Sequence, residues 1–170
     1  VLSDNCIELL QNGLVDIAMA APNVPPEEYA SEIFYADSFF LICRRDHPLA
    51  TRECVAIDDL RGCDFIHLAG TASIHQFVVK AIGATGVNPS SFEIRNLSTM
   101  AGLILQGLGV SLLPELTLYQ FQQPELTAIP LAPPGISRSI HIIWRKDKPL
   151  SVAAQAMLEL IRATKPVLKS

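Results

Sequence analysis

The chain has 170 residues, of which 49% are apolar and 18% are charged, so its composition is that of a globular protein and not of a disordered one. Its 17 acidic and 13 basic residues give a net charge of −4, which argues against a dedicated nucleic-acid surface. No apolar run approaches the roughly 20 residues that a membrane-spanning helix needs, and no signal peptide is recognisable.

The first elements that we expect are a short helix and a buried strand. Residues 3–10 carry apolar side chains on one helical face, Ser3 is placed to cap the helix, and Gly13 ends it. The apolar run 14–20 is interrupted only by one aspartate, which is typical of a strand buried on both faces. The proline-rich residues 21–26 then predict a loop.

The middle of the chain predicts further strands and a loop of small residues. Residues 33–35 and 39–43 are rich in aromatic and β-branched side chains, and the polar pair at 37–38 is interpreted as a turn between two strands. Residues 64–68 predict another strand. It leads into a loop of small and hydroxyl residues at 69–73, from which a helix is expected to start.

The most informative stretch combines a helix, a glycine turn and a strand. Ser98 or Thr99 is placed to cap the helix, because a short hydroxyl satisfies a free backbone N–H there. Gly107 and Gly109 end the helix, since glycine adopts the left-handed conformation without steric cost. The apolar residues 110–113 then predict a short buried strand, which completes half of an α/β unit.

The remaining elements complete the alternation of helices and strands. A helix is expected over 74–82, a half-exposed strand over 92–95, a short helix over 116–121, and strands over 126–129 and 139–144. A final helix is expected to be capped by Ser151 and to bury Ala154, Met157, Leu158 and Ile161. The alternation indicates an α/β architecture with mostly parallel sheets.

Five segments occur in the order found in one protein family. They are residues 11–19 (QNGLVDIAM), 45–50 (RDHPLA), 57–62 (IDDLRG), 98–114 (STMAGLILQGLGVSLLP) and 146–151 (KDKPLS). They are distributed along nearly the whole chain, from residue 11 to residue 151. The sequence therefore resembles the effector-binding domain, or LysR substrate-binding domain, of LysR-type transcriptional regulators.

The resemblance implies a two-lobed α/β fold like that of the type 2 periplasmic binding proteins, with mixed sheets flanked by helices. Lobe I is expected to comprise residues 1–45 plus 141–170, and lobe II residues 46–140, with crossover strands at 39–45 and 140–145. The strand, helix and strand that open lobe I in the family are absent from this sequence, as is the winged helix-turn-helix. We therefore expect a fragment of a longer regulator.

No constellation for catalysis is apparent in the sequence. None of the four histidines shares a motif with a cysteine or a paired acid, so each is interpreted as a packed or surface residue. Cys54 and Cys63 are spaced as a redox pair could be, but free thiols are the preferred interpretation. The loop 70–73 lacks the cysteine that peroxide-sensing members of the family carry there. We expect no enzyme, no metal and no cofactor.

A ligand site is expected where strands end and helices begin, because two-lobed α/β proteins bind ligands there and free helix N–H groups suit an anion. The resemblance implies effector contacts at the same places. The candidate residues are Ser3, Ala21, Pro22, Ala69, Gly70, Thr71, Ser73, Ser98 and Thr99. Ser73 is equally well explained as a helix cap, and Ser98 and Thr99 are interpreted as caps first. Ala21 stands where other members have Thr or Arg, which argues against a strongly charged effector.

The resemblance also implies how such a domain works. A small polar or singly anionic metabolite is expected to bind in the cleft between the lobes and to signal to an N-terminal winged helix-turn-helix, which alone would bind promoter DNA. The whole protein is expected to be a cytoplasmic homodimer or homotetramer without a membrane partner. The side chains of Ile74, Phe77, Val78 and Ile82 form either an association face or a core stripe. The alternative function is a periplasmic solute-binding protein of a transporter, which would share the fold.

Overall fold

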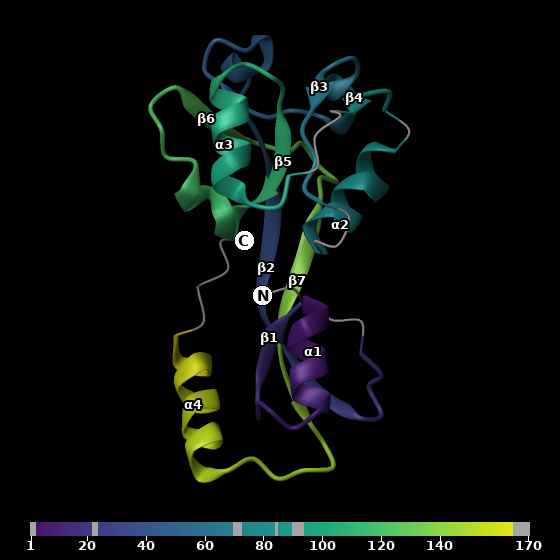
Figure 1. Cartoon of the computed structure of the whole chain (residues 1–170), viewed down its shortest axis with the longest axis vertical. Coiled ribbons are helices and arrows are strands. Elements are labelled where there is room, and N and C mark those ends of the chain that lie inside the picture. The colour runs from purple at the N-terminus through teal and green to yellow at the C-terminus, as the bar shows by residue number, and fades with distance from the viewer. Residues whose placement is uncertain (1–2, 22–23, 70–72, 84, 90–93, 165–170) are drawn as a thin grey trace. The chain divides into compact units, whose positions relative to one another are not determined.

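The computed structural model describes residues 3–21, 24–69, 73–83, 85–89 and 94–164. It divides into two compact units: unit 1 comprises residues 1–36 and 138–170, and unit 2 comprises residues 37–137. The chain passes from unit 1 to unit 2 within strand β2 (Tyr29–Arg44) and returns at the start of strand β7 (Ser137–Arg145) (Figure 1). No helix in the described ranges is long and apolar enough to cross a membrane.

Unit 1 combines helix α1 (Ser3–Gln11) with a small sheet. Strand β1 (Ala18–Ala20) pairs antiparallel with β7, and β7 lies between β1 and β2. The buried core of this unit consists of Leu10, Ala18, Ala20, Tyr29 and Ile143. The predicted strand 14–20 is too long, because Leu14 is 70% exposed and its N–H donates to the carbonyl of Leu9 in the turn after α1.

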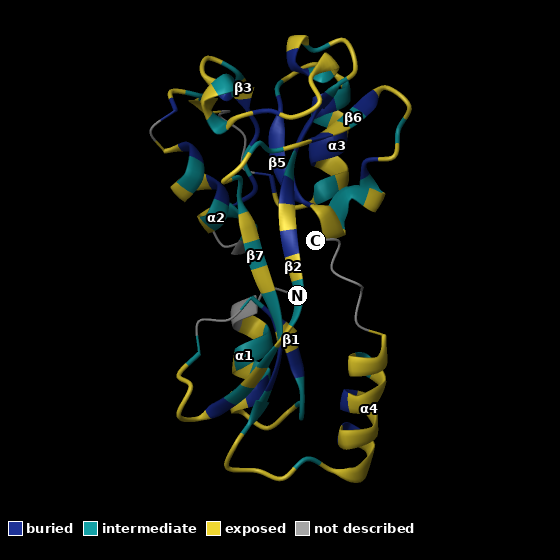
Figure 2. Cartoon of the chain, turned by 180° about the vertical axis from the view of Figure 1, so that it is seen from behind, coloured by how far each residue is buried: buried dark blue, intermediate teal, exposed yellow. Residues whose placement is uncertain are grey.

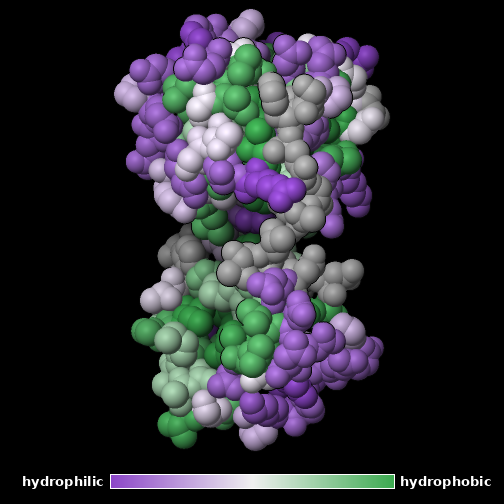
Figure 3. All heavy atoms as spheres, viewed as in Figure 1, coloured by the Kyte–Doolittle hydropathy of each residue, from purple (hydrophilic) through white to green (hydrophobic). Residues whose placement is uncertain are grey.

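Helix α4 (Val152–Ala163) begins where the sequence predicts. The hydroxyl of Ser151 accepts a hydrogen bond from the Ala154 N–H at 3.2 Å, so the predicted cap is confirmed. Ala154 and Leu158 are buried as predicted, whereas Met157 is 53% exposed. The exposed side of α4 forms a hydrophobic patch (Figure 3) with Val152, Met157 and Leu160.

The side chain of Arg162 connects α4 to the sheet of unit 1. Its guanidinium donates to Glu32 of β2 and to Glu159 one turn earlier in the helix, the latter at 2.6 Å. The same group lies 6.0 Å from the centroid of the Trp144 ring on β7. The side chains of Arg162, Glu32 and Glu159 are all exposed, so their ion pairs add little to the free energy of unfolding. Their main effect is to orient α4 on the sheet.

Strand β2 is one continuous strand of 16 residues, so the prediction of two strands separated by a turn at 37–38 is wrong. Asp37 is fully buried, and its carboxylate accepts a hydrogen bond from the Leu116 N–H at 3.1 Å. Leu116 belongs to the short helix η3 (Glu115–Gln120), which is far away in the sequence. The aspartate therefore caps a distant segment instead of forming a local turn.

Unit 2 has helices on both faces of a central sheet (Figure 1). In it β2 pairs antiparallel with β5 (Ser111–Pro114) and with β6 (Leu126–Pro130). Adjacent residues of β2 face opposite cores: Leu41 packs in the cluster that contains α2 (Ser73–Ile82), and Ile42 in the cluster that contains α3 (Leu97–Leu105). Figure 2 shows β5 buried between these layers.

The pairing of strands is mixed. Strand β3 (Asp64–Phe65) pairs parallel with β4 (Asn88–Pro89), whereas the pairs of β2 with β5 and β6 and of β1 with β7 are antiparallel. The expectation of mostly parallel sheets is therefore wrong, because β5 and β6 both run opposite to the long strand β2. The α/β class with mixed sheets and flanking helices is confirmed.

The apolar face of α2 is a core stripe. Val78 and Ile82 are 4% and 3% exposed, and Ile74 and Phe77 pack against the same cluster. The structure therefore favours the core interpretation of these four residues over the association face. The short helices η1 (Pro48–Thr51) and η2 (Ile57–Leu60) cover this side of unit 2 with Leu49 and Leu60.

The glycine turn after α3 brings two backbone segments into close contact. Gly109 has a φ of +146°, and a Cβ built there would lie 2.4 Å from the carbonyl oxygen of Asp64. The next residue, Val110, donates its N–H to that same oxygen at 2.9 Å. Only glycine allows this approach, which positions β3 beside the start of β5.

Candidate functional site

The candidate site is the strand-to-helix connection of unit 2, residues 66–75. The Ile66 N–H donates to the carbonyl of Val110 at 2.9 Å, and the Ala69 N–H donates to that of Ile94 at 2.7 Å. Strand β3 ends at Phe65, earlier than the predicted strand over 64–68, and residues 66–69 continue it as an extended segment with one isolated bridge, from Leu68 to Ile94. This segment is held by two separate parts of the chain. Residues 70–72 lie outside the described residues, and α2 begins at Ser73. The extended segment therefore leads to a helix N-terminus, where free N–H groups suit an anion.

The structure places the predicted site residues in both units. Ala69 is 6% exposed at the end of the extended segment, and Ser73 is the first residue of α2, both in unit 2. Ser3 is the first residue of α1, and Ala21 directly follows β1, both in unit 1. Pro22, Gly70 and Thr71 lie outside the described residues.

The prediction that Ser98 or Thr99 caps α3 is wrong. The cap is Asn96, whose side-chain oxygen accepts a hydrogen bond from the Thr99 N–H at 2.7 Å. Asn96 has extended backbone angles, as a cap requires, and the helix starts at Leu97. Ser98 and Thr99 lie in the first turn with exposed side chains, so they stay candidates for ligand contact.

Alanine substitutions are expected to distinguish Asn96 from Ser98 as the cap of α3. Asn96→Ala should lower the free energy of unfolding by about 1 kcal/mol, because the first turn of α3 loses its acceptor. Ser98→Ala should change it by less than about 0.5 kcal/mol, since an exposed helical serine makes no capping bond. Urea denaturation of both variants measures the difference, and equal losses would contradict the assignment of the cap.

A pair of histidines, each of which the sequence predicts to be a packed or surface residue, flanks the connection. His67 lies in the extended segment and His75 in the first turn of α2, and their ring centroids are 5.8 Å apart. The ring of His67 also lies 4.8 Å from that of Phe65. The Nδ1 atoms of both histidines are buried and have no hydrogen-bond partner in the described part of the chain. Burial, and then the neighbouring His75, lower the pKa of His67 below its usual 6.5.

The lowered pKa of His67 predicts a loss of stability in acid. As the pH falls below about 6.5, the unfolded chain takes up a proton on His67 before the folded chain does, so folding becomes less favourable. His67→Gln should lose less stability than the wild type between pH 7.5 and 5.5. Urea unfolding at the two pH values tests this. A residual loss of stability is expected in the variant, because burial also lowers the pKa of His47 and His141. An unchanged pH dependence in His67→Gln would contradict the prediction.

The described residues do not present an activated nucleophile or a metal cluster. No group of three or more His, Cys, Asp or Glu side chains among them could hold a metal ion. Burial, with Cys63 nearby, raises the pKa of Cys43 to about 11, and burial raises that of Cys63 as well. These two thiols therefore stay protonated at neutral pH and are poor nucleophiles.

Comparison with known sequences points to one family. The LysR substrate binding domain matches residues 1–166. The uncharacterized HTH-type transcriptional regulator YbhD of Escherichia coli (strain K12) is 32% identical over 160 residues, which are 94% of this chain and 50% of that protein. The chain spans about half the length of the curated relatives that it matches.

Solved structures share the fold. The regulatory domain of Synechocystis PCC6803 CcmR, in complex with 2-PG, superposes with a TM-score of 0.85 at 23% identity, over 99% of this chain and 82% of that one. The effector binding domain of QuiR, in complex with shikimate, gives a TM-score of 0.79 at 15% identity, over 97% and 78%. Fold and sequence agree, and the chain belongs to the LysR substrate-binding domain family of transcriptional regulators.

Proposed function

We propose that the 66–75 connection binds a small polar or singly anionic metabolite, and that this ligand regulates a LysR-type transcription factor. This proposal is supported by the extended segment 66–69, which ends at the buried residue Ala69 and is followed within a few residues by the N-terminus of α2. Such a junction offers backbone N–H groups to a ligand, and we propose that the hydroxyls of Thr71 and Ser73 add to them.

The charges around the connection limit the class of ligand. No lysine or arginine lies within residues 66–75, and the lowered pKa of His67 keeps that ring neutral at pH 7. A ligand with several negative charges would therefore meet no full positive charge from this segment. Hydroxyl and N–H donors suit a carboxylate or a polyol, with a net gain of about 0.5–1.5 kcal/mol for each hydrogen bond.

Relatives support a small-molecule ligand. The structures of the CcmR and QuiR domains hold 2-PG and shikimate, respectively. We propose that Ser3, Ala21, Pro22, Ser98 and Thr99 also contact the ligand. None of the relatives named above is a transport protein, so we do not propose the transporter alternative.

We further propose that promoter DNA is bound by a part of the regulator outside residues 1–170, because this chain carries a net charge of −4. The regulator would act in the cytoplasm as a homodimer or homotetramer, as expected from the family resemblance. Neither proposal changes the ligand chemistry expected at the connection.

A thermal-shift screen tests the proposed ligand class. Residues 1–170 are heated with small monocarboxylic acids, neutral polyols, and compounds that carry several phosphates. A compound that binds the folded state raises the midpoint, by about 2 °C or more when it is well above its Kd. We expect shifts from members of the first two sets. A shift from the polyphosphates alone, or from no compound, would contradict the proposal.

A further inference from the structure

Unit 1 contains a cavity of about 450 Å³ that plays no part in the proposed effector site. It lies where α1 ends, β2 begins and β7 ends, and its lining residues are Gln11, Glu27, Glu28, Tyr29, Arg145, Lys146 and Asp147. All of them belong to unit 1, and none belongs to the 66–75 connection. The cavity is large enough for a small organic molecule.

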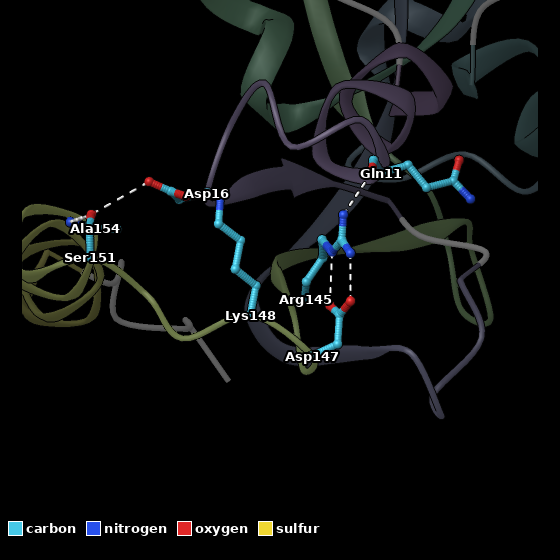
Figure 4. Close-up of polar contacts among 7 residues, drawn as sticks. All are labelled: Gln11, Asp16, Arg145, Asp147, Lys148, Ser151 and Ala154. Atoms are coloured by element: carbon cyan, nitrogen blue, oxygen red, sulfur yellow. Dashed lines mark hydrogen bonds and ion pairs between the residues drawn. The ribbon is translucent and has the colours of Figure 1, made fainter.

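The cations of this cavity already have partners. Arg145 donates two hydrogen bonds to the carboxylate of Asp147, at 2.8 and 2.5 Å, and a third to the carbonyl of Gln11 at 2.7 Å (Figure 4). This arrangement raises the pKa of Arg145 and fixes its guanidinium against the end of α1. The Lys146 ammonium donates to the carbonyl of Pro26 at 2.7 Å. Neither cation is therefore presented fully to a ligand.

Two of the three acids and the phenol of the cavity lack partners within the described residues. The carboxylates of Glu27 and Glu28 make no ion pair or hydrogen bond within the described residues, and both side chains are exposed. Tyr29 is 5% exposed, lines the cavity and lies close enough to Arg145 to influence its pKa. No hydrogen bond of the Tyr29 hydroxyl is found in the described part of the chain. Because the side chain of Tyr29 is otherwise buried and lines the cavity, its hydroxyl is left to the solvent of the cavity or to a ligand bound there.

We propose that this cavity binds the ammonium group of a small amine. Three carboxylates and two cations line it. Arg145 and Asp147 pair with each other, and Lys146 is bonded to the Pro26 carbonyl, so the carboxylates of Glu27 and Glu28 remain without a cation. An ammonium group donates three hydrogen bonds and has no acceptor, so it complements two carboxylates and a phenol oxygen. The proposal is independent of the proposed effector function, since the two sites share no residue.

Calorimetric titration of residues 1–170 with 1,4-diaminobutane, 1-aminobutane and butyrate tests the proposal. A blocked lysine, N-acetyl-lysine amide, is the fourth probe. The amines should bind saturably, and butyrate should not. If the diamine binds, a free small molecule is the source of the ammonium. If only the blocked lysine binds, the source is a lysine side chain of another protein, and the small-amine proposal is overturned.

Three variants locate the binding. Glu28→Gln keeps the size and removes the charge, and should weaken amine binding about tenfold. Tyr29→Phe removes only the hydroxyl and should weaken it roughly threefold. Glu53→Gln, an exposed acid of unit 2, is the matched control and should leave it unchanged. Circular dichroism verifies that each variant is folded. No saturable binding of either amine, or equal binding to Glu28→Gln and the wild type, would overturn the proposal.

Discussion

Gly109→Ala is expected to lower the free energy of unfolding by about 3 kcal/mol or more, the upper part of the range for single substitutions. The new methyl group would lie 2.4 Å from the Asp64 carbonyl oxygen and 3.0 Å from its carbon, and both are backbone atoms. The φ of +146° is also strained for alanine. Relief of the clash would separate Asp64 from Val110 and break their hydrogen bond.

The matched control is Gly102→Ala in α3. A Cβ at Gly102 meets nothing within 4 Å, and alanine is a better helix former than glycine by about 1 kcal/mol. Gly102→Ala should therefore be neutral or stabilising. Urea denaturation of the two variants gives both values. Equal effects, or a neutral Gly109→Ala, would contradict the close approach of β3 and β5.

Phe65→Ala is expected to cost about 3–5 kcal/mol, the usual loss for a large aromatic removed from a packed core. Phe65 is fully buried in the cluster under α2, and its ring contacts that of His67. The cavity would open directly beneath the 66–75 connection. We therefore also expect weaker binding of the effector, since the extended segment that ends at Ala69 loses its support.

An exposed aromatic of the same unit provides the comparison for Phe65. Tyr119 is 67% exposed in η3, and Tyr119→Ala should change the free energy of unfolding by less than about 0.5 kcal/mol. Differential scanning calorimetry of both variants measures the effects. A loss below about 1 kcal/mol for Phe65→Ala would mean that the core around β3 is not packed as described.

Features with a local physical cause were predicted well from the sequence. The helix, glycine turn and strand at 98–114 depend on apolar spacing and on two glycines with positive φ, Gly107 and Gly109. The Ser151 cap depends on one hydroxyl and the N–H of Ala154. Such signals are complete within a few residues, so the sequence alone contains them.

Features decided by distant contacts were missed. Asp37 has the composition of a turn, but its carboxylate accepts a hydrogen bond from Leu116, and the strand continues through it. The cap of α3 was missed for a local reason, since Asn96, Ser98 and Thr99 are all residue types that cap helices and lie within four positions of one another. Local propensity allowed either choice, and backbone geometry selected one.

The candidate site also has some features that the sequence predicts and others that it does not. The position of the connection followed from a strand, small residues and a helix in sequence, and Ala69 and Ser73 lie there. The proximity of His67 and His75 could not be predicted, because they lie on either side of the connection, one in the extended segment after β3 and the other in α2. The cavity around Tyr29 is assembled from three elements and has no motif of its own.

The most direct test of the effector site is calorimetric titration of two threonine variants with a compound that the thermal-shift screen identifies. Thr71→Val keeps the shape of the side chain and removes its hydroxyl from the proposed site, and should weaken binding roughly 2- to 10-fold. Thr51→Val makes the same change at an exposed position of η1 and should bind as the wild type does. Unchanged affinity in Thr71→Val, or equal losses in both variants, would contradict the location of the effector site at the 66–75 connection.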